Sequence, residues 1–246
     1  MNKPITITEM FVSVNGEGSE LGRRTAFVRT FGCHANCPGC DTMYSKEGSQ
    51  AVPTKEIQAD DIIQFCNSHK IKHVTFTGGE PFEQKNIHEF IKYLTQRGFQ
   101  ITVETNGLQK PQNAGAFTAV VSPKPWMLTD QNRDSYFYWA RMGAMFKFVG
   151  SIDDVDRIRK WYRIFRLEKA YLQMWVDKPE QKTHEGYWKA YLELVNEVNK
   201  KCVDGEDIRI TPQIHKLFAG FSATGKEEEA KLAKLIIPKF IKPKKQ

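Results

Sequence analysis

The chain contains 246 residues, of which 40% are hydrophobic and 26% charged, and its formal net charge is +7. This length suits one domain of barrel or open-sheet size, and no segment has the composition of a disordered chain. No apolar run reaches the roughly 18 residues that a membrane-spanning helix needs. The first residues, MNKPITITEMF, lack the apolar region of a secretory signal. The sequence therefore predicts no membrane segment.

The positive charge lies partly in the tail after Thr224, where acidic residues are interspersed with lysines. Basic chains attract phosphate-bearing partners, but this mixture of signs favours a solvated surface over a nucleic-acid-binding one. Five cysteines, an odd number, argue against a disulfide framework. Cys66 and Cys202 stand alone and are interpreted as buried structural thiols. Free thiols that bind a metal group require a reducing compartment, so we expect the protein in the cytoplasm.

Seven short runs rich in β-branched residues predict strands, at Thr25–Thr30, His73–Thr77, Gln100–Glu104, Ala119–Ser122, Met145–Val149, Ala170–Trp175 and Asp207–Thr211. Helical periodicity between them predicts amphipathic helices, whose apolar faces carry Ile87, Phe90, Ile91 and Leu94, then Val155, Ile158, Tyr162 and Phe165, then Tyr187, Tyr191, Leu194, Val195 and Val198. Ser151 and Asp154 have the spacing of a capping box, and Gly98 has the position of a helix C-cap.

Alternating strands and helices predict an α/β fold with a mostly parallel sheet and helices outside it. Because the strands are fewer than a full eightfold barrel needs, we expect an incomplete (β/α)6-type TIM-like barrel. This domain would occupy residues 1–225, and residues 226–246 would form a lysine-rich C-terminal extension. Ligands of such sheets bind at the carboxyl ends of the strands, where the distinctive residues fall, namely Cys33, Thr77–Glu80, Glu104–Gly107 and Ser122–Lys124.

Cys33, Cys37 and Cys40 form the pattern Cys-x3-Cys-x2-Cys. Three thiolates at this spacing can hold three irons of a [4Fe–4S] cluster and leave the fourth iron open to a small molecule. A structural zinc ion, the alternative, needs four ligands, usually in two separated pairs. The chain has no second cysteine pair, and His34 lies directly beside Cys33, where it cannot easily share its metal. The pattern therefore favours a cluster over zinc.

Thr77-Gly78-Gly79-Glu80-Pro81 follows the second predicted strand. Two glycines let a ligand approach the backbone closely, and free backbone groups beside a carboxylate suit a charged amino group. An ordinary turn into a helix beginning near Pro81 is the alternative. The cysteine spacing and this motif together resemble the radical S-adenosylmethionine (SAM) enzymes. In such an enzyme one electron splits a C–S bond of SAM and releases a 5′-deoxyadenosyl radical, and we expect Glu80 to bind the SAM amino group.

Flanking residues narrow this resemblance. They are Phe11–Gly18 with its Gly-Glu-Gly, Phe27–Cys33, Asp41-Thr42 after the last cysteine, and Thr211–Lys216 with its Gln-x-His-Lys. Together, over roughly residues 5–218, they resemble the 7-carboxy-7-deazaguanine synthase family. The resemblance implies a lyase that contracts 6-carboxy-5,6,7,8-tetrahydropterin to 7-carboxy-7-deazaguanine and releases ammonia in 7-deazapurine (queuosine-type) biosynthesis. It also implies a homodimer and an electron donor such as a flavodoxin or ferredoxin.

The resemblance also assigns residues to ligands. Cys33, Cys37 and Cys40 would hold the cluster; Gly39, Cys40, Asp41, Gly79, Glu80, Ser122, Pro123, Lys124, Gln173, Met174, Trp175 and Val176 would contact SAM; Val14, Asn15, Gly16, Glu17, Arg29, Thr77 and His215 would contact the substrate; and Thr42 would bind Mg²⁺. Many members have glutamine where this chain has Asn15, and 31 residues follow His215, so a contact from the chain terminus is not carried over.

Each assignment has a physical basis. The planar fork of Arg29 fits a carboxylate, and Glu17 can accept hydrogen bonds from the N–H edge of a pterin. Mg²⁺ takes hard oxygen ligands, so beside a lone threonine the substrate must supply oxygens. More ordinary roles are a strand-end ion pair for Arg29, a core histidine for His215 and a turn cap for Thr42.

Alternative interpretations also exist for three aromatic residues and for the function of the whole protein. Tyr136, Tyr138 and Trp139 are interpreted as packing or interface residues rather than a cofactor site. Two rival functions stay open from the sequence, a glycyl-radical-enzyme activating enzyme and a zinc-bearing nucleic-acid-binding protein. The Gly-Glu-Gly and Gln-x-His-Lys elements argue against the first, and the missing fourth zinc ligand argues against the second.

Overall fold

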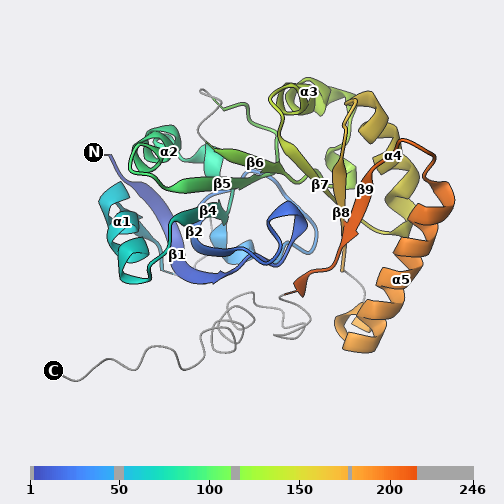
Figure 1. Ribbon diagram of the computed structural model, residues 1–246, viewed down its shortest axis with the longest axis horizontal. Coiled ribbons are helices and arrows are strands. Elements are labelled where there is room, and N and C mark those ends of the chain that lie inside the picture. The colour runs from blue at the N-terminus through green and yellow to red at the C-terminus, as the bar shows by residue number, and fades with distance from the viewer. Residues whose placement is uncertain (1–2, 47–52, 112–116, 177–178, 215–246) are drawn as a thin grey trace.

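A curled sheet organises the chain in the computed structural model, which describes residues 3–46, 53–111, 117–176 and 179–214 (Figure 1). Its strands are β1 (Ile5–Val14), β2 (Arg24–Thr30), β3 (Lys55–Ile57), β4 (His73–Gly78), β5 (Gln100–Thr105), β6 (Thr118–Val121), β7 (Met145–Gly150), β8 (Ala170–Met174) and β9 (Ile208–Thr211). The helices are α1 (Ala59–Ser68), α2 (Ile87–Thr95), α3 (Arg133–Arg141), α4 (Val155–Ile164) and α5 (His184–Lys201).

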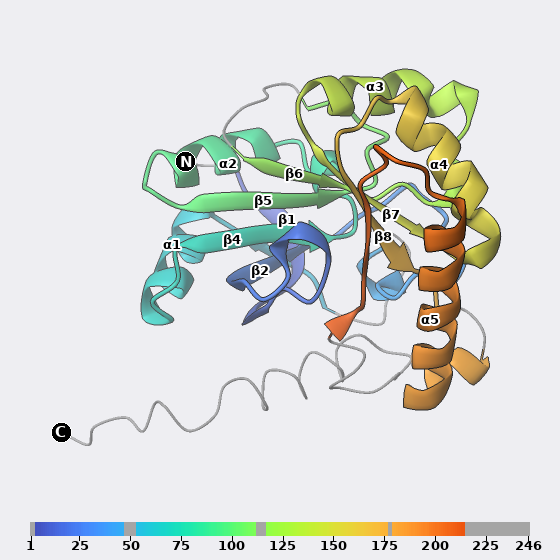
Figure 2. The same ribbon diagram turned by 45° about the vertical axis from the view of Figure 1, so that its right-hand side comes forward.

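The strand order is β3-β1-β2-β4-β5-β6-β7-β8-β9. From β2 onward every neighbouring pair is parallel, whereas β1 pairs antiparallel with both β2 and β3. Helices lie along the outer side of the curled sheet (Figure 2). The predicted α/β partial barrel is confirmed, and the seven predicted strands match β2 and β4–β9 within one residue at each end.

Two strands and two helices escaped prediction. In β1, polar residues such as Thr8 and Ser13 occupy buried positions, so the strand lacks the apolar run that marks its neighbours. With β3 it forms an antiparallel edge beside the parallel strands. The helices α1 and α3 were likewise missed, but Tyr136 and Trp139 on α3 are fully buried, which confirms their packing role.

The predicted faces of α2 and α4 and the Ser151–Asp154 capping box are confirmed, but on α5 Tyr191 and Val195 are only partly buried, and the C-cap of α2 is Gln96 rather than Gly98. Ile87, Phe90, Ile91 and Leu94 of α2 are buried, as are Val155, Ile158 and Tyr162 of α4. Ser151 N–H donates to Asp154 Oδ2 at 2.9 Å in the expected capping box, and Gly98 has a left-handed φ of +79°. Cys66 is buried as expected, whereas Cys202, at the end of α5, is only half-buried.

On strand β7 one face of the sheet packs in the hydrophobic core and the other faces a cavity. Phe146 and Phe148 are fully buried, and Phe146 packs on Tyr136 of α3 and on Phe165 beyond α4. Burying such side chains contributes about 1.5–3 kcal/mol each to folding. Because side chains alternate along a strand, Lys147 and Val149 face the opposite side, where a cavity lies.

Backbone contact joins the ends of β2 and β4. Gly79 N–H donates to the Thr30 carbonyl at 2.8 Å, and Glu80 N–H donates to the Gly32 carbonyl at 2.7 Å. A Cβ on Gly79 would lie 1.9 Å from the Gly32 oxygen, which no side chain can tolerate. The glycine therefore fixes the start of the cysteine segment against the end of β4.

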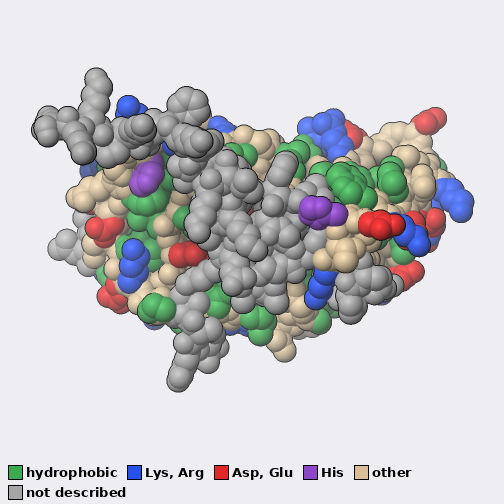
Figure 3. All heavy atoms as spheres, turned by 90° about the horizontal axis from the view of Figure 1, so that it is seen from below, with side chains coloured by type: hydrophobic (Ala, Val, Ile, Leu, Met, Phe, Trp, Pro, Cys, Tyr) green, Lys and Arg blue, Asp and Glu red, His purple; other side chains and the backbone are tan. Residues whose placement is uncertain are grey.

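Two further features concern membrane segments and the distribution of surface charge. No helix in the described ranges is long and apolar enough to cross a membrane. On the face shown in Figure 3, basic and acidic side chains of the described residues lie interspersed. The tail after Thr224, on which the expectation of a solvated surface rests, lies outside the described residues. The proposed extension, residues 226–246, lies outside the described residues.

Gly79→Ala should lower the free energy of unfolding by about 3 kcal/mol, because the new methyl group forces β4 away from Gly32. Gly98→Ala is the matched control, since Gly98 also has positive φ but meets nothing within 4 Å. We expect it to cost only about 1–2 kcal/mol from backbone strain. Urea denaturation under anaerobic conditions measures both, and equal losses would contradict the steric argument.

Candidate active site

A cavity of about 290 Å³ opens at the carboxyl ends of the parallel strands. Among its lining residues are nearly all of the predicted ones, namely Val14, Asn15, Gly16, Glu17, Arg29, Cys33, Cys37, Gly39, Cys40, Asp41, Thr42, Thr77, Gly79, Glu80, Ser122, Lys124, Gln173, Met174, Trp175 and Val176. Pro123 does not line it, and His215 lies outside the described residues. The structure thus brings the predicted residues to one place, and which ligand each one contacts stays a prediction.

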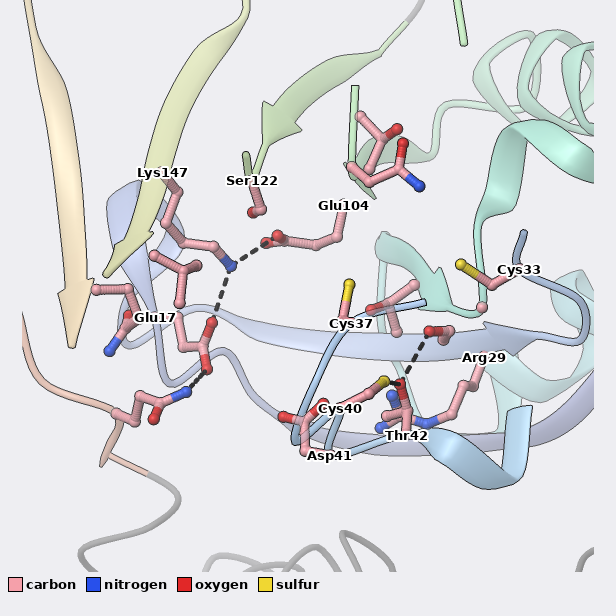
Figure 4. A pocket seen from close by; sticks show the side chains of 18 of the residues that line it. Glu17, Arg29, Cys33, Cys37, Cys40, Asp41, Thr42, Glu104, Ser122 and Lys147 are labelled. Atoms are coloured by element: carbon pink, nitrogen blue, oxygen red, sulfur yellow. Dashed lines mark hydrogen bonds and ion pairs between the residues drawn. The ribbon is translucent and has the colours of Figure 1, made fainter. Parts of the chain in front are cut away.

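The cysteine segment follows β2 and forms one wall of the cavity (Figure 4). Cys33, Cys37 and Cys40 are free and half-buried, and burial raises the pKa of Cys33 to about 11. Gly39 between them has φ +62°, and a Cβ there would meet the Trp175 ring at 3.3 Å. This glycine lets the segment turn directly over the aromatic ring.

Zinc binding is not supported by the geometry. Across the described ranges, no three His, Cys, Asp or Glu side chains converge closely enough to hold one metal ion. The imidazole of His34 pairs with Glu83, whose Oε1 also accepts from the His34 backbone N–H at 2.9 Å. His34 therefore points to a carboxylate partner. A cluster, which spreads its thiolates over several irons, fits the three cysteines better.

Glu80 is a buried carboxylate that lines the cavity. Oε1 accepts from Thr105 Oγ1 at 2.7 Å and from the Phe82 backbone N–H at 3.2 Å, and Oε2 accepts from Asn106 N–H at 2.8 Å. Burial raises its pKa, although these hydrogen bonds oppose the rise. All of these donors are neutral, so the site lacks a countercharge from these contacts. Glu80 also caps the short helix Pro81–Glu83, which confirms the predicted turn.

A second group of charges lies on the other side of the cavity (Figure 4). Lys147 Nζ donates to Glu17 Oε2 and to Glu104 Oε2, each at 2.8 Å. Glu17 Oε1 accepts from Gln213 Nε2 at 2.8 Å. Four segments thus meet here: the loop after β1, strand β5, strand β7 and the residues after β9. We call Glu17, Glu104 and Lys147 the charge cluster.

Of the two roles weighed for Arg29 from the sequence, the ion pair is confirmed and the contact with substrate stays a prediction. Arg29 forms an ion pair with Glu9, Nε to Oε1 at 2.7 Å, and it also lines the cavity. Tyr44 donates to the same Glu9 oxygen at 2.9 Å, and the guanidinium lies over the rings of Phe11 and Tyr44. Glu9 and the two rings therefore orient the guanidinium within the cavity wall.

Thr42 lies beside the last cysteine. Its Oγ1 donates to the Gly78 carbonyl at 3.2 Å and is 3.6 Å from Cys40 Sγ. A hydroxyl that donates to a carbonyl keeps its lone pairs for another partner. The expected turn-capping role is not seen, because Thr42 makes no side-chain cap hydrogen bond at the short helix Met43–Ser45.

Several lining residues carry a buried polar atom without a hydrogen-bond partner in the described structure. These atoms are Ser13 Oγ, Asn15 Nδ2, Asn106 Nδ2, Ser122 Oγ and Gln213 Oε1. Leaving such a group unpaired costs about 1–3 kcal/mol. Because these unpaired groups gather around one cavity, the cavity is suited to polar ligands. SAM and a substrate rich in hydrogen-bonding groups both meet this condition.

Comparison with known proteins agrees with this geometry. Residues 14–112 match the family described as the 4Fe-4S single cluster domain. The fold resembles the crystal structure of QueE from Escherichia coli, with a TM-score of 0.61 and 20% identity over 85% of this chain and 94% of that one. It also resembles the anSMEcpe structure with bound AdoMet, with a TM-score of 0.51 and 14% identity over 73% of this chain and 58% of that one.

Sequence relatives are more specific. The 7-carboxy-7-deazaguanine synthase of Clostridium acetobutylicum is 30% identical over 66% of this chain and 76% of the relative. Those of Aquifex aeolicus and Pyrobaculum aerophilum are 26% and 29% identical over 87% and 90% of this chain and 93% and 97% of the relatives.

A cluster-binding cysteine segment at the mouth of a partial parallel barrel defines a radical SAM enzyme, with a [4Fe–4S] cluster and SAM as cofactors. The chain belongs to the 7-carboxy-7-deazaguanine synthase family, whose members are carbon–nitrogen lyases of 7-deazapurine biosynthesis. This assignment confirms the family expected from the sequence. It argues against the two rival functions, a zinc-bearing nucleic-acid-binding protein and a glycyl-radical-enzyme activating enzyme.

Sequence reasoning missed Lys147 and gave no role to Glu104 or Gln213. A signal for Lys147 was present, because it is a charged residue in the apolar strand Met-Phe-Lys-Phe-Val. Such a residue must have a buried partner. Glu104 and Gln213 lay inside motifs already noted, but only the fold shows that both reach the charge cluster.

Replacing Cys33, Cys37 or Cys40 singly by alanine should abolish the cluster, since no other thiol lines the cavity among the described residues. Cys66→Ala and Cys202→Ala are matched controls, because both cysteines lie outside the cavity. Iron and sulfide content after anaerobic reconstitution is the measurement. Full iron content in any of the three variants, or its loss in Cys202→Ala, would contradict the assignment.

Proposed function

We propose that this enzyme contracts 6-carboxy-5,6,7,8-tetrahydropterin to 7-carboxy-7-deazaguanine with release of ammonia. One observation carries the proposal: the cysteine segment, Arg29 and the charge cluster line the same cavity. A cofactor site and a site for a carboxylate-bearing, N–H-rich substrate are thereby adjacent. When bound, the cluster and SAM supply the radical that removes a hydrogen atom from C6 of the pterin.

The cofactors would be held by groups at the end of β4 and in the cysteine segment. Cys33, Cys37 and Cys40 would bind the cluster. Glu80 Oε2 accepts one backbone hydrogen bond, from Asn106 N–H, and a carboxylate oxygen can accept a second. An ammonium group of SAM would supply the countercharge that this buried carboxylate lacks in its described contacts. Asn106 and Ser122, with unpaired polar atoms, would hydrogen-bond the same ligand.

The substrate would lie between Arg29 and the charge cluster. Arg29 would bind the substrate carboxylate, since a guanidinium fits a carboxylate in two parallel hydrogen bonds. Glu17 would accept from the N–H edge of the pterin, and Asn15 Nδ2, which lacks a partner, would donate to a substrate oxygen or nitrogen. Phe11, Phe27 and Trp175 also line the cavity and would exclude water around the reacting ring.

Mg²⁺ would bind beside Thr42, through the hydroxyl lone pairs that its bond to Gly78 leaves unused. One hydroxyl is a poor magnesium site, so substrate oxygens and water would complete the octahedron. Bound there, the ion would orient the substrate and stabilise negative charge during the ring contraction.

The surrounding biology is also part of the proposal. The electron would come from a small donor protein such as a flavodoxin or ferredoxin, and the enzyme would work in the cytoplasm, where its free thiols stay reduced. A homodimer is expected from the family. Trp188 and Leu192, one turn apart on α5, are exposed apolar residues that support such an interface.

Anaerobically reconstituted enzyme, given SAM, Mg²⁺, a reductant and the carboxytetrahydropterin, should produce one ammonium ion for each 7-carboxy-7-deazaguanine. Liquid chromatography with mass detection and an ammonium assay measure both products. Cys37→Ala provides the control without a cluster. Absence of product from wild-type enzyme with full iron content would refute the proposal.

Thr42→Ala should remove most of the rate stimulation by Mg²⁺ while SAM binding stays within about twofold, because the hydroxyl and not the backbone is lost. Thr42→Ser keeps the hydroxyl and should keep the stimulation. Rates measured across a Mg²⁺ titration, with SAM affinity from equilibrium binding, decide the assignment. Equal Mg²⁺ stimulation in the alanine variant and the wild type would show that Thr42 is not a ligand.

A further inference from the structure

Lys147 is a buried lysine in the cavity wall, and the proposed function gives it no contact with a ligand. Its side chain is 7% exposed, and its ammonium group lies 2.8 Å from one oxygen of Glu17 and 2.8 Å from one oxygen of Glu104 (Figure 4). Gly18, with φ +57°, packs on its stem, since a Cβ there would meet Lys147 Cδ at 3.1 Å. The loop after β1 is thus shaped around this lysine.

The titratable groups around Lys147 come from several elements of the fold. Glu17 faces it from the loop after β1 and Glu104 from β5, while Lys124 lies near Glu104 and Tyr187 of α5 near Glu17. Burial alone would lower the pKa of Lys147, but the two carboxylates outweigh it and raise that pKa above its usual range. Burial raises the pKa of Glu104, and Lys147 opposes this.

One oxygen of Glu104 is available to a ligand. Among its described contacts only Oε2 makes a hydrogen bond, and the side chain, which is 15% exposed, lines the cavity. Without a cation between them, two carboxylates this close would share a proton, which turns one acceptor into a donor. The lysine prevents this, so both groups remain acceptors.

We propose that Lys147 is a positioning residue for the substrate, which holds Glu17 and Glu104 ionised side by side so that they accept from its N–H-rich aminopyrimidinone edge. This inference rests on the proposed function for the identity of the ligand. In it, Glu104 Oε1 contacts the substrate directly, and Lys147 acts through the two carboxylates. An anionic group is excluded from this side of the cavity, so the substrate carboxylate must face Arg29 instead.

The test uses reconstituted enzyme and 7-carboxy-7-deazaguanine, the product, which binds without turnover. Calorimetry between about pH 6 and 9 should show wild-type affinity that barely changes with pH. Lys147→Met should bind at least tenfold more weakly at the low end, where the carboxylates share a proton and one of them no longer accepts, and recover partly at the high end, where both are ionised. In turnover its KM should rise more than its kcat falls. Unchanged affinity with a flat pH profile would overturn the proposal.

Lys201→Met is the matched control, because Lys201 also lies between two carboxylates, Asp156 at 2.6 Å and Glu197 at 2.9 Å, but outside the cavity. It should behave as the wild type. The double variant Lys147→Met/Glu104→Gln leaves one carboxylate in the cluster and should lose the pH dependence of the single variant. Persistence of that dependence in the double variant would also overturn the proposal.

A second readout separates this inference from the proposed function. If wild-type enzyme binds no product, the assigned ligand is wrong, and thermal unfolding then tests the charge cluster alone. The melting temperature of Lys147→Met should fall further below the wild type as pH rises above about 5, because carboxyl groups with a raised folded pKa destabilise the fold once ionised. A constant difference across pH would show that Lys147 does not hold the carboxylates ionised.

Discussion

The contact between Gly32 and Gly79 determines where everything else in the site can lie. Two backbone hydrogen bonds, from Gly79 to Thr30 and from Glu80 to Gly32, bind the end of β2 to the end of β4 without an intervening side chain. The cysteine segment begins at the next residue, so its path over the barrel mouth is fixed by main chain rather than by flexible contacts. The same turn places the carboxylate of Glu80 near Cys33.

The inner and outer faces of the strands divide the work between stability and chemistry. On β7 the phenylalanines face the helices and stabilise the fold, while the lysine between them faces the cavity. The period of two along a strand makes this separation possible, because a residue can change chemistry on one face without disturbing the packing on the other. The site is therefore built on rigid strands, with loops supplying the cysteines and Glu17.

The parallel strands, three helices and the place of the site could be predicted from sequence for a physical reason, whereas most individual site residues came from the family resemblance. Buried parallel strands are apolar runs, and their carboxyl ends always meet at one edge, so Thr77, Glu104 and Ser122 had to lie together. Strand β1 could not be predicted in this way, because Thr8 and Ser13 fill buried positions with polar groups. The partners of Lys147 come from positions 130 and 43 residues away, which no local pattern encodes.

The two sides of the cavity differ in charge balance, and this difference bears on where each proposed ligand would bind. Around Glu80 a buried carboxylate meets only neutral donors among its described contacts, so that side calls for a cation. In the charge cluster an ammonium already stands between two carboxylates, so that side calls for neutral N–H donors. If a ligand with an ammonium group and a ligand with an aminopyrimidinone edge occupy this cavity together, as we propose, these charges favour one arrangement. The first would lie beside the cysteines and Glu80, and the second would lie against Glu17 and Glu104 with its carboxylate turned toward Arg29.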